Sequence, residues 1–110
     1  MSKAAGNWKR NRHNHEFLGS TRLAGTTLHN HRFAGVSGRA IFVGNTHVHV
    51  IKTNTDFTAR HFHKIKDISG PEIPVGLGRH VHFVRGRTSF DLGHRHGYLF
   101  ATLIENPLLL

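Results

Sequence analysis

The chain alternates hydrophobic and polar positions at six places, and the alternation has the same form each time. Two histidines stand two residues apart, and an apolar or aromatic residue follows the second histidine by two positions. The six following positions are Phe17, Phe33, Ile51, Ile65, Val84 and Tyr98. Residues two apart lie on the same face of a β-strand but on nearly opposite sides of a helix. The pattern therefore predicts six strands, each with two imidazoles and one apolar side chain on one face.

The spacing of the histidine pairs indicates an internal repeat. All 12 histidines fall in pairs, which are His13/His15, His29/His31, His47/His49, His61/His63, His80/His82 and His94/His96. Alternate pairs lie 34 and 33 residues apart in one series and 32 and 33 residues apart in the other. The segments between the pairs are rich in Gly, Thr, Asn and Asp, which favour turns. The predicted fold class is all-β, with three tandem β-hairpin repeats of about 33 residues (six main strands) that form a small barrel, a sandwich or a short solenoid.

A chain of 110 residues is long enough for one small domain. The predicted units are a basic N-terminal arm (1–12), a single β domain (13–107) with repeats at 13–45, 46–78 and 79–107, and an apolar C-terminal tail (108–110). Short extra strands are expected in the links between repeats, at residues 40–43 and 73–75.

Histidine at this density indicates metal binding. Two pairs on paired strands would supply up to four imidazoles, which suits Zn²⁺ in a tetrahedral site or Cu²⁺ and Ni²⁺ in a flatter one. The chain has no cysteine and only 6 acidic side chains, which argues against thiolate sites and against Ca²⁺ and Mg²⁺. We therefore expect all 12 histidines to bind transition-metal ions, with copper or zinc favoured and nickel as the alternative. The competing interpretations are buried, hydrogen-bonded histidines without metal, and a pH-responsive structural protein.

The charge balance introduces a second functional class. Lys and Arg number 15 against 6 Asp and Glu, which gives a formal net charge of +9. Such a balance attracts nucleic acid and other polyanions, and the basic residues are densest at Lys9, Arg10 and Arg12. The alternative function is therefore a nucleic-acid- or polyanion-binding module in which the histidine face is structural.

Motifs of familiar enzyme classes are missing from the sequence. It contains no His-x-His-x-Asp-His metal-hydrolase pattern, no Gly-x-Ser-x-Gly turn and no phosphate-binding loop. Six equivalent pairs are typical of a binding or structural lattice, whereas an active site usually occurs once. We expect a protein that is not an enzyme, and a metal enzyme is the minority alternative.

The ends of the chain bear on assembly and location. Trp8 near the start and the terminal Leu108, Leu109 and Leu110 are apolar groups that favour self-association. We expect a homo-oligomer, either a closed ring or a filament or tube. No apolar signal-peptide segment opens the sequence, and no apolar run is long enough to cross a membrane. We expect a cytoplasmic protein, with an extracellular filament formed by leaderless export as the alternative.

Several longer motifs resemble a known family. They include "HEFLGSTRLA", "HNHRFAGVSG", "GPEIPVGLGRHVHF" and "FATLIENP". In these motifs the chain resembles the YmaF family of small bacterial proteins, and the resemblance covers nearly all of the chain from His13 to Pro107. The resemblance by itself implies no particular biochemical activity.

Overall fold

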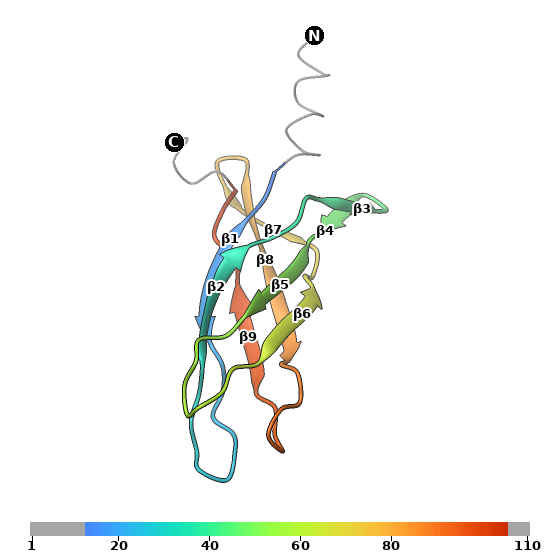
Figure 1. The fold of residues 1–110 in the computed structure, drawn as a ribbon. Helices are drawn as coiled ribbons and strands as arrows, with labels where there is room; N and C mark the ends of the chain where they lie inside the picture. The colour runs from blue at the N-terminus through green and yellow to red at the C-terminus, as the bar shows by residue number, and fades with distance from the viewer. Residues whose placement is uncertain (1–12, 106–110) are drawn as a thin grey trace.

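The computed structural model describes residues 13–105, which form strands and loops and contain no helix (Figure 1). The strands are β1 (Glu16–Ser20), β2 (Arg32–Val36), β3 (Ile41–Val43), β4 (Thr46–Val48), β5 (Val50–Asn54), β6 (Lys64–Ile68), β7 (Glu72–Gly76), β8 (Arg79–Arg87) and β9 (Gly97–Ala101). The all-β prediction is confirmed for this part of the chain, in which no helix could cross a membrane. The two short strands expected in the links are present as β3 and β7.

Consecutive strands pair antiparallel in three hairpins, which we call hairpin 1 (β1 with β2), hairpin 2 (β5 with β6) and hairpin 3 (β8 with β9). Two shorter pairings lie in the connections: β3 pairs with β4, and β7 pairs with the first half of β8. The three hairpins carry the six predicted apolar positions, and the shorter pairings extend beyond one end of them (Figure 1).

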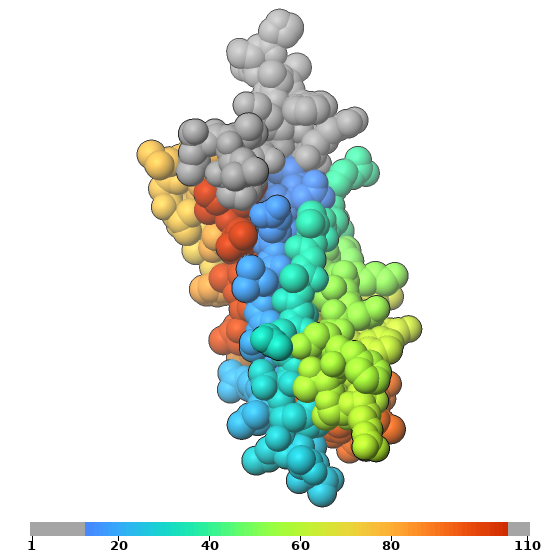
Figure 2. Space-filling model, turned by 60° about the vertical axis from the view of Figure 1, so that its left-hand side comes forward, coloured from blue at the N-terminus to red at the C-terminus, as the bar shows by residue number. Residues whose placement is uncertain are grey.

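Each hairpin lies beside both of the others. β2 lies beside β5, β6 beside β8, and β9 beside β1; Figure 2 shows the last of these seams, with β9 in red against β1 in blue. Backbone hydrogen bonds join a seam at its two ends, as Gly70 N to Phe83 O and Ser89 N to Lys64 O, both 2.8 Å, join β6 to β8. The barrel alternative is wrong for the described residues, because the strands form separate small sheets and the ladder stops at each seam.

The core between the hairpins consists of the six apolar positions named above and Phe100, all at most 9 % exposed. Glycine makes room for an aromatic ring where Phe17 lies across from Gly35, because a Cβ there would be 2.7 Å from the ring. The Tyr98 hydroxyl donates to Asp67 Oδ2 at 2.8 Å, which ties hairpin 3 to hairpin 2. Seven side chains are a small core for a domain of this length, so contacts at the ends of the core also matter for stability.

Candidate metal centres

The 12 histidines gather in two clusters, one toward each end of the core. Cluster A consists of His13, His15, His47, His49, His80 and His82. Cluster B consists of His29, His31, His61, His63, His94 and His96. Each cluster takes one pair from the start of one strand of each hairpin, so all the predicted ligands are brought together in two groups.

The two pairs of one hairpin do not share a site, and the expected group of four imidazoles on paired strands is wrong. His15 directly precedes β1, and His31 directly precedes β2. Because the strands of an antiparallel hairpin run in opposite directions, their starts lie at opposite ends. The pairs therefore separate, and each cluster assembles six imidazoles from three hairpins.

Each cluster has an inner and an outer layer of three rings. The inner histidines are the second members of the pairs and are at most 1 % exposed: His15, His49 and His82 in cluster A, and His31, His63 and His96 in cluster B. The outer histidines are the first members: His13, His47 and His80 in cluster A, and His29, His61 and His94 in cluster B. The inner rings point toward the core because the next residue on the same strand face is a core residue.

The Nε2 atoms of each cluster are placed as the corners of an octahedron. All six candidate ligand atoms lie within 4.8 Å of one another. Four neighbouring pairs of Nε2 atoms in each cluster are 3.0–3.3 Å apart, for example 3.1 Å between His13 and His47. With a metal–nitrogen bond of about 2.1 Å, an octahedron has adjacent ligands about 3.0 Å apart and opposite ligands about 4.2 Å apart. The observed adjacent spacings are close to the first value, and the 4.8 Å limit on all pairs is compatible with the second.

The packing of the rings has the same symmetry. Each imidazole meets the other rings of its cluster edge-on, at centroid distances of 4.5–5.1 Å and interplanar angles of 67–89°, except for the one ring opposite. The pairs without such an edge-on contact are His13/His82, His15/His47 and His49/His80 in cluster A, and His29/His63, His31/His94 and His61/His96 in cluster B, and we take them as the opposite pairs. Three such pairs around one centre define an octahedron.

Hydrogen bonds at Nδ1 orient the inner rings. His49 Nδ1 donates to Gly38 O at 2.8 Å in cluster A, and His96 Nδ1 donates to Arg22 O at 2.9 Å in cluster B. The other inner rings make the same kind of bond to the carbonyls of Leu103, Gly70, Asp56 and Ser89. Each acceptor follows a strand of a different hairpin from the one that supplies the histidine, so the clusters also lock the hairpins together.

The outer rings are held differently in the two clusters. In cluster A, His47 Nδ1 lies 2.9 Å from a Glu72 carboxylate oxygen, and His80 Nδ1 lies 3.2 Å from one of Glu105. In cluster B each outer Nδ1 donates to a carbonyl two residues earlier in its own turn, and the acceptors are Thr27, Ala59 and Leu92. Such partners fix the orientation of a ligand imidazole and raise its basicity.

These bonds also fix which ring nitrogen carries the hydrogen. A carbonyl oxygen only accepts, so an Nδ1 bonded to one must be protonated, and the Nε2 lone pair then points to the cluster centre. The Nε2 atoms of His49, His82 and His96 are buried without a hydrogen-bond partner. Converging lone pairs about 3 Å apart repel one another, and a central cation would relieve that repulsion. Each buried cluster can therefore hold a metal ion.

The comparison with protein families agrees with the motifs in the sequence. The YmaF family model, described as "Spore germination protein GerY/YamF", matches residues 10–104, which is most of the chain. The chain belongs to the YmaF family. No curated protein and no solved structure matches it. The resemblance that the motifs indicated is confirmed, and the two histidine clusters lie within the matched range of this YmaF chain.

Burial favours the neutral form of eight imidazoles of this YmaF chain. Burial, with a smaller contribution from repulsion between neighbouring rings, lowers the pKa of His15 and of His49 to about 3. Burial followed by repulsion from neighbouring rings lowers the pKa of His47 to about 4, and burial lowers that of His96 to about 4. The pKa values of His31, His63, His80 and His82 are also lowered, mainly by burial. Neutral imidazole is the form that binds a metal ion.

Ser and Thr hydroxyl groups accept hydrogen bonds from the backbone N–H groups of the inner histidines, and the sequence did not identify them as partners. The backbone N–H of His49 donates to Ser69 Oγ at 2.9 Å, and that of His31 donates to Thr21 Oγ1 at 2.9 Å. The four remaining inner histidines donate in the same way to Ser37, Thr102, Thr55 and Thr88. Sequence reasoning also missed Glu72 and Glu105, although each stands three residues after one of these hydroxyls, in "SGPE" and "TLIE".

Some predicted residues cannot be placed. The predicted basic cluster (Lys9, Arg10 and Arg12) and the predicted assembly residues (Trp8, Leu108, Leu109 and Leu110) lie outside the described residues. These predictions stay untested.

Proposed function

We propose that the protein binds two transition-metal ions, one at the centre of each histidine cluster. The observation that carries the proposal is the set of converging Nε2 atoms, 3.0–3.3 Å apart, whose lone pairs are directed inward by the bonds at Nδ1. A purely hydrogen-bonded cluster would give each buried Nε2 a donor, and three of them have none.

The octahedral arrangement supports an ion that accepts six nitrogen ligands. Zinc sites in proteins are almost always four-coordinate, and Cu²⁺ favours a flattened, tetragonal set. Of the ions that suit imidazole, Ni²⁺ and Fe²⁺ take six ligands without such distortion. We therefore propose Ni²⁺ or Fe²⁺ ahead of the copper and zinc that the type of ligand alone favoured.

We propose that the bound ions are structural or stored and do not act as catalysts. A catalytic metal keeps an open position for water or substrate, whereas six imidazoles would fill every position of an octahedral ion. Each ion would join all three hairpins, and its binding energy would add to the stability that the small hydrophobic core provides.

We also propose that the chain consists of three tandem hairpin repeats. Support comes from the equivalent hydroxyl and carbonyl partners of the inner histidines, which recur around the three hairpins in cyclic order. The description of its family supports a role in spore germination.

Self-association through the chain ends is a separate proposal, and light scattering of variants lacking residues 1–10 or 108–110 tests it: unchanged particle size would contradict it.

Metal content of the purified chain tests the main proposal. After equilibration with Ni²⁺ or Fe²⁺ and removal of free metal, mass spectrometry should find two ions per chain. Replacing the outer ring of cluster A (His13→Gln, His47→Gln, His80→Gln) should leave one ion, and so should the matching triple replacement in cluster B. The control Asn30→Ala lies between two ligands of cluster B without removing either, and it should still bind two.

X-ray absorption of the loaded protein supplies the geometry. We expect six nitrogen neighbours at about 2.1 Å. A chain that ignores added Ni²⁺, Fe²⁺, Cu²⁺ and Zn²⁺, or one that keeps two ions after either triple replacement, would sink the proposal. A four-coordinate spectrum would contradict the octahedral assignment alone.

A further inference from the structure

Cations gather on the outward faces of hairpins 2 and 3, on the side of the strands opposite the core. Lys52 lies on β5, Lys64 and Lys66 lie on β6, and Arg85 and Arg87 lie on β8. All five side chains are exposed. We call this surface the cationic face.

The strand pairing brings these charges close together. Lys52 stands directly opposite Lys66 in the β5–β6 register. Across the neighbouring seam, β6 and β8 run antiparallel, and Ser89 N bonds to Lys64 O. Arg87, two residues before Ser89, therefore lies level with Lys66, two residues after Lys64. The cationic face thus contains a row of three positive charges on three adjacent strands.

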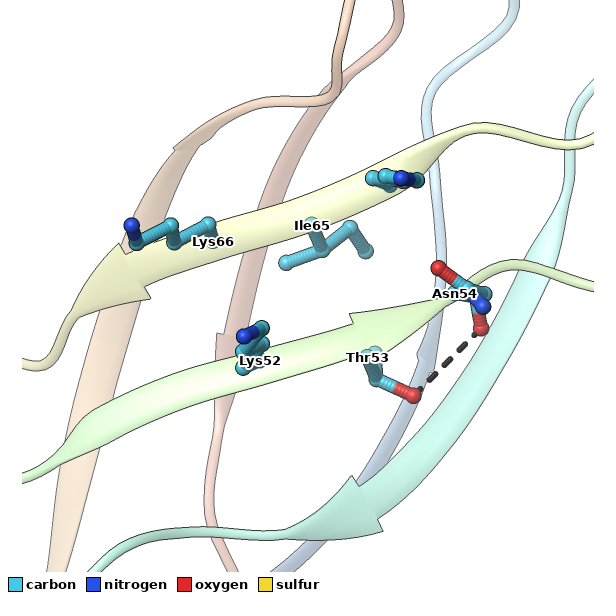
Figure 3. A pocket seen from close by; sticks show the side chains of 6 residues that line it. Lys52, Thr53, Asn54, Ile65 and Lys66 are labelled. Atoms are coloured by element: carbon cyan, nitrogen blue, oxygen red, sulfur yellow. Dashed lines mark hydrogen bonds between the residues drawn. The ribbon is translucent and has the colours of Figure 1, made fainter.

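Figure 3 shows the part of this face on hairpin 2, with the labelled Lys52 and Lys66 on adjacent strands. An open hollow of about 460 Å³ is lined here by Lys52, Lys64 and Lys66, with Thr53, Asn54 and Ile65. A flexible anionic ligand would find three ammonium groups around one depression.

Among the described residues, no acid forms an ion pair with these cations. The nearby Asp67 accepts the Tyr98 hydroxyl, and Asp91 accepts the Ser89 hydroxyl and lies 3.2 Å from His63 Nδ1. Like charges directly opposite each other destabilise a sheet, so the face is better suited to an anionic partner than to water alone.

Two exposed aromatic rings flank the row of cations. Phe62, 42 % exposed, stands two residues before Lys64, and Phe83, 53 % exposed, stands two residues before Arg85. Positions two apart share a strand face. Because β6 and β8 run antiparallel, the two rings lie on opposite sides of the charged row, displaced from it along the strand direction.

We propose that the cationic face binds single-stranded nucleic acid. Same-face cations recur about 6.6 Å apart along each strand, and lysine and arginine would contact successive phosphates. Exposed rings beside a basic track are the elements on which unpaired bases stack. A simple polyanion would need only the charges, so Phe62 and Phe83 are the feature that distinguishes nucleic acid.

Fluorescence anisotropy with a labelled oligothymidine of about 20 nucleotides tests the proposal on the full-length chain. Replacing Lys64, Lys66, Arg85 and Arg87 with Ser should weaken binding roughly tenfold or more and flatten the salt dependence by a slope of about 3, since each phosphate contact contributes about 0.7. The control Arg39→Ser with Arg95→Ser removes exposed charge elsewhere and should change affinity much less. Circular dichroism confirms that each variant is folded.

The double replacement Phe62→Ala with Phe83→Ala separates the kinds of anionic partner. It should weaken oligothymidine binding several-fold and leave heparin binding unchanged. Equal losses in both ligands, or no loss in either, would overturn a nucleic-acid site in favour of general polyanion attraction. Equal weakening by the four-residue variant and by its control, or no measurable binding by the unmodified chain, would overturn the cationic face itself.

Discussion

Clusters A and B have the same arrangement of imidazoles but differ in their outer layers. The outer rings of cluster A are at most 8 % exposed and two of them contact Glu72 and Glu105. In cluster B, His29 and His94 are partly exposed, and the outer rings bond to carbonyls of their own turns. The acids near cluster B, Asp56 and Asp91, lie beside inner rings.

The comparison separates the affinity of a site from access to it. Both clusters have six imidazoles and two carboxylates nearby, so their charge balance is similar. In cluster A, His47 lies in β4 and His80 in β8, so the β3–β4 and β7–β8 pairings lie beside the outer rings, whereas the outer rings of cluster B close three turns and two of them are partly exposed. We therefore expect similar geometry in the loaded sites but faster exchange of metal at cluster B.

Metal removal should have the largest effect. Each site that is filled at a thousandfold excess over its Kd adds about 4 kcal/mol to the free energy of unfolding. Treatment of the loaded chain with EDTA should release metal in two phases, the first from cluster B, and the melting temperature should fall in two steps.

The triple Gln variants assign these two phases. The cluster B variant should lose the fast phase and the cluster A variant the slow one, with Asn30→Ala as the unchanged control. A single phase in the unmodified chain would show that the clusters do not differ in access.

Acid should destabilise the metal-free chain. An unfolded histidine takes up a proton near pH 6.5, whereas folded His15 and His49 do so near pH 3 and His47 and His96 near pH 4. The unfolded state therefore binds more protons between these limits, and stability is lost as the pH falls below 6.5. Each such imidazole contributes a slope of about 1.4 kcal/mol per pH unit.

Urea unfolding at pH 7 and pH 5 measures this slope. Replacing His15 and His49 with Gln should flatten it by about twice as much as replacing His96 alone. Equal flattening by the double and the single replacement would contradict a lowered pKa for both His15 and His49.

The glutamates of cluster A should have a smaller effect that is limited to one site. Glu72→Gln with Glu105→Gln keeps the shape but removes the charge behind His47 and His80, and loss of such partners weakens metal affinity about 10–100-fold. Calorimetric titration should show one weakened site and one unchanged site. Glu16→Gln, on the exposed face of β1, is the control. A loss at both sites would indicate a general charge effect.

The sequence was informative wherever the structure depends on local alternation. The His-x-His pattern predicted the candidate ligands and placed Phe17, Ile51 and Tyr98 on the same strand face as the histidines, and all three are buried in the core. The separation of the pairs was also implicit, because a pair that always precedes its apolar position must lie at the start of a strand. Opposite strand directions then place the two pairs of a hairpin at opposite ends.

Other features depend on contacts between distant segments and gave little local signal. Glu105, which follows β9, reaches His80 on the paired strand β8, and Asp67 meets Tyr98 across the seam between hairpins 2 and 3. The barrel alternative was wrong for the same reason. Alternation along the chain predicts strands, but the number of backbone hydrogen bonds between neighbouring hairpins depends on contacts between distant segments.

The third seam has a consequence for the order of the chain. Leu103 N bonds to Glu16 O at 2.8 Å, so the last and first hairpins meet as the covalently linked ones do. The contacts among the three hairpins therefore do not depend on which hairpin comes first in the chain. A circularly permuted chain, opened at the exposed Gly44–Asn45 turn and joined by a linker between its original ends, should rebuild both octahedra.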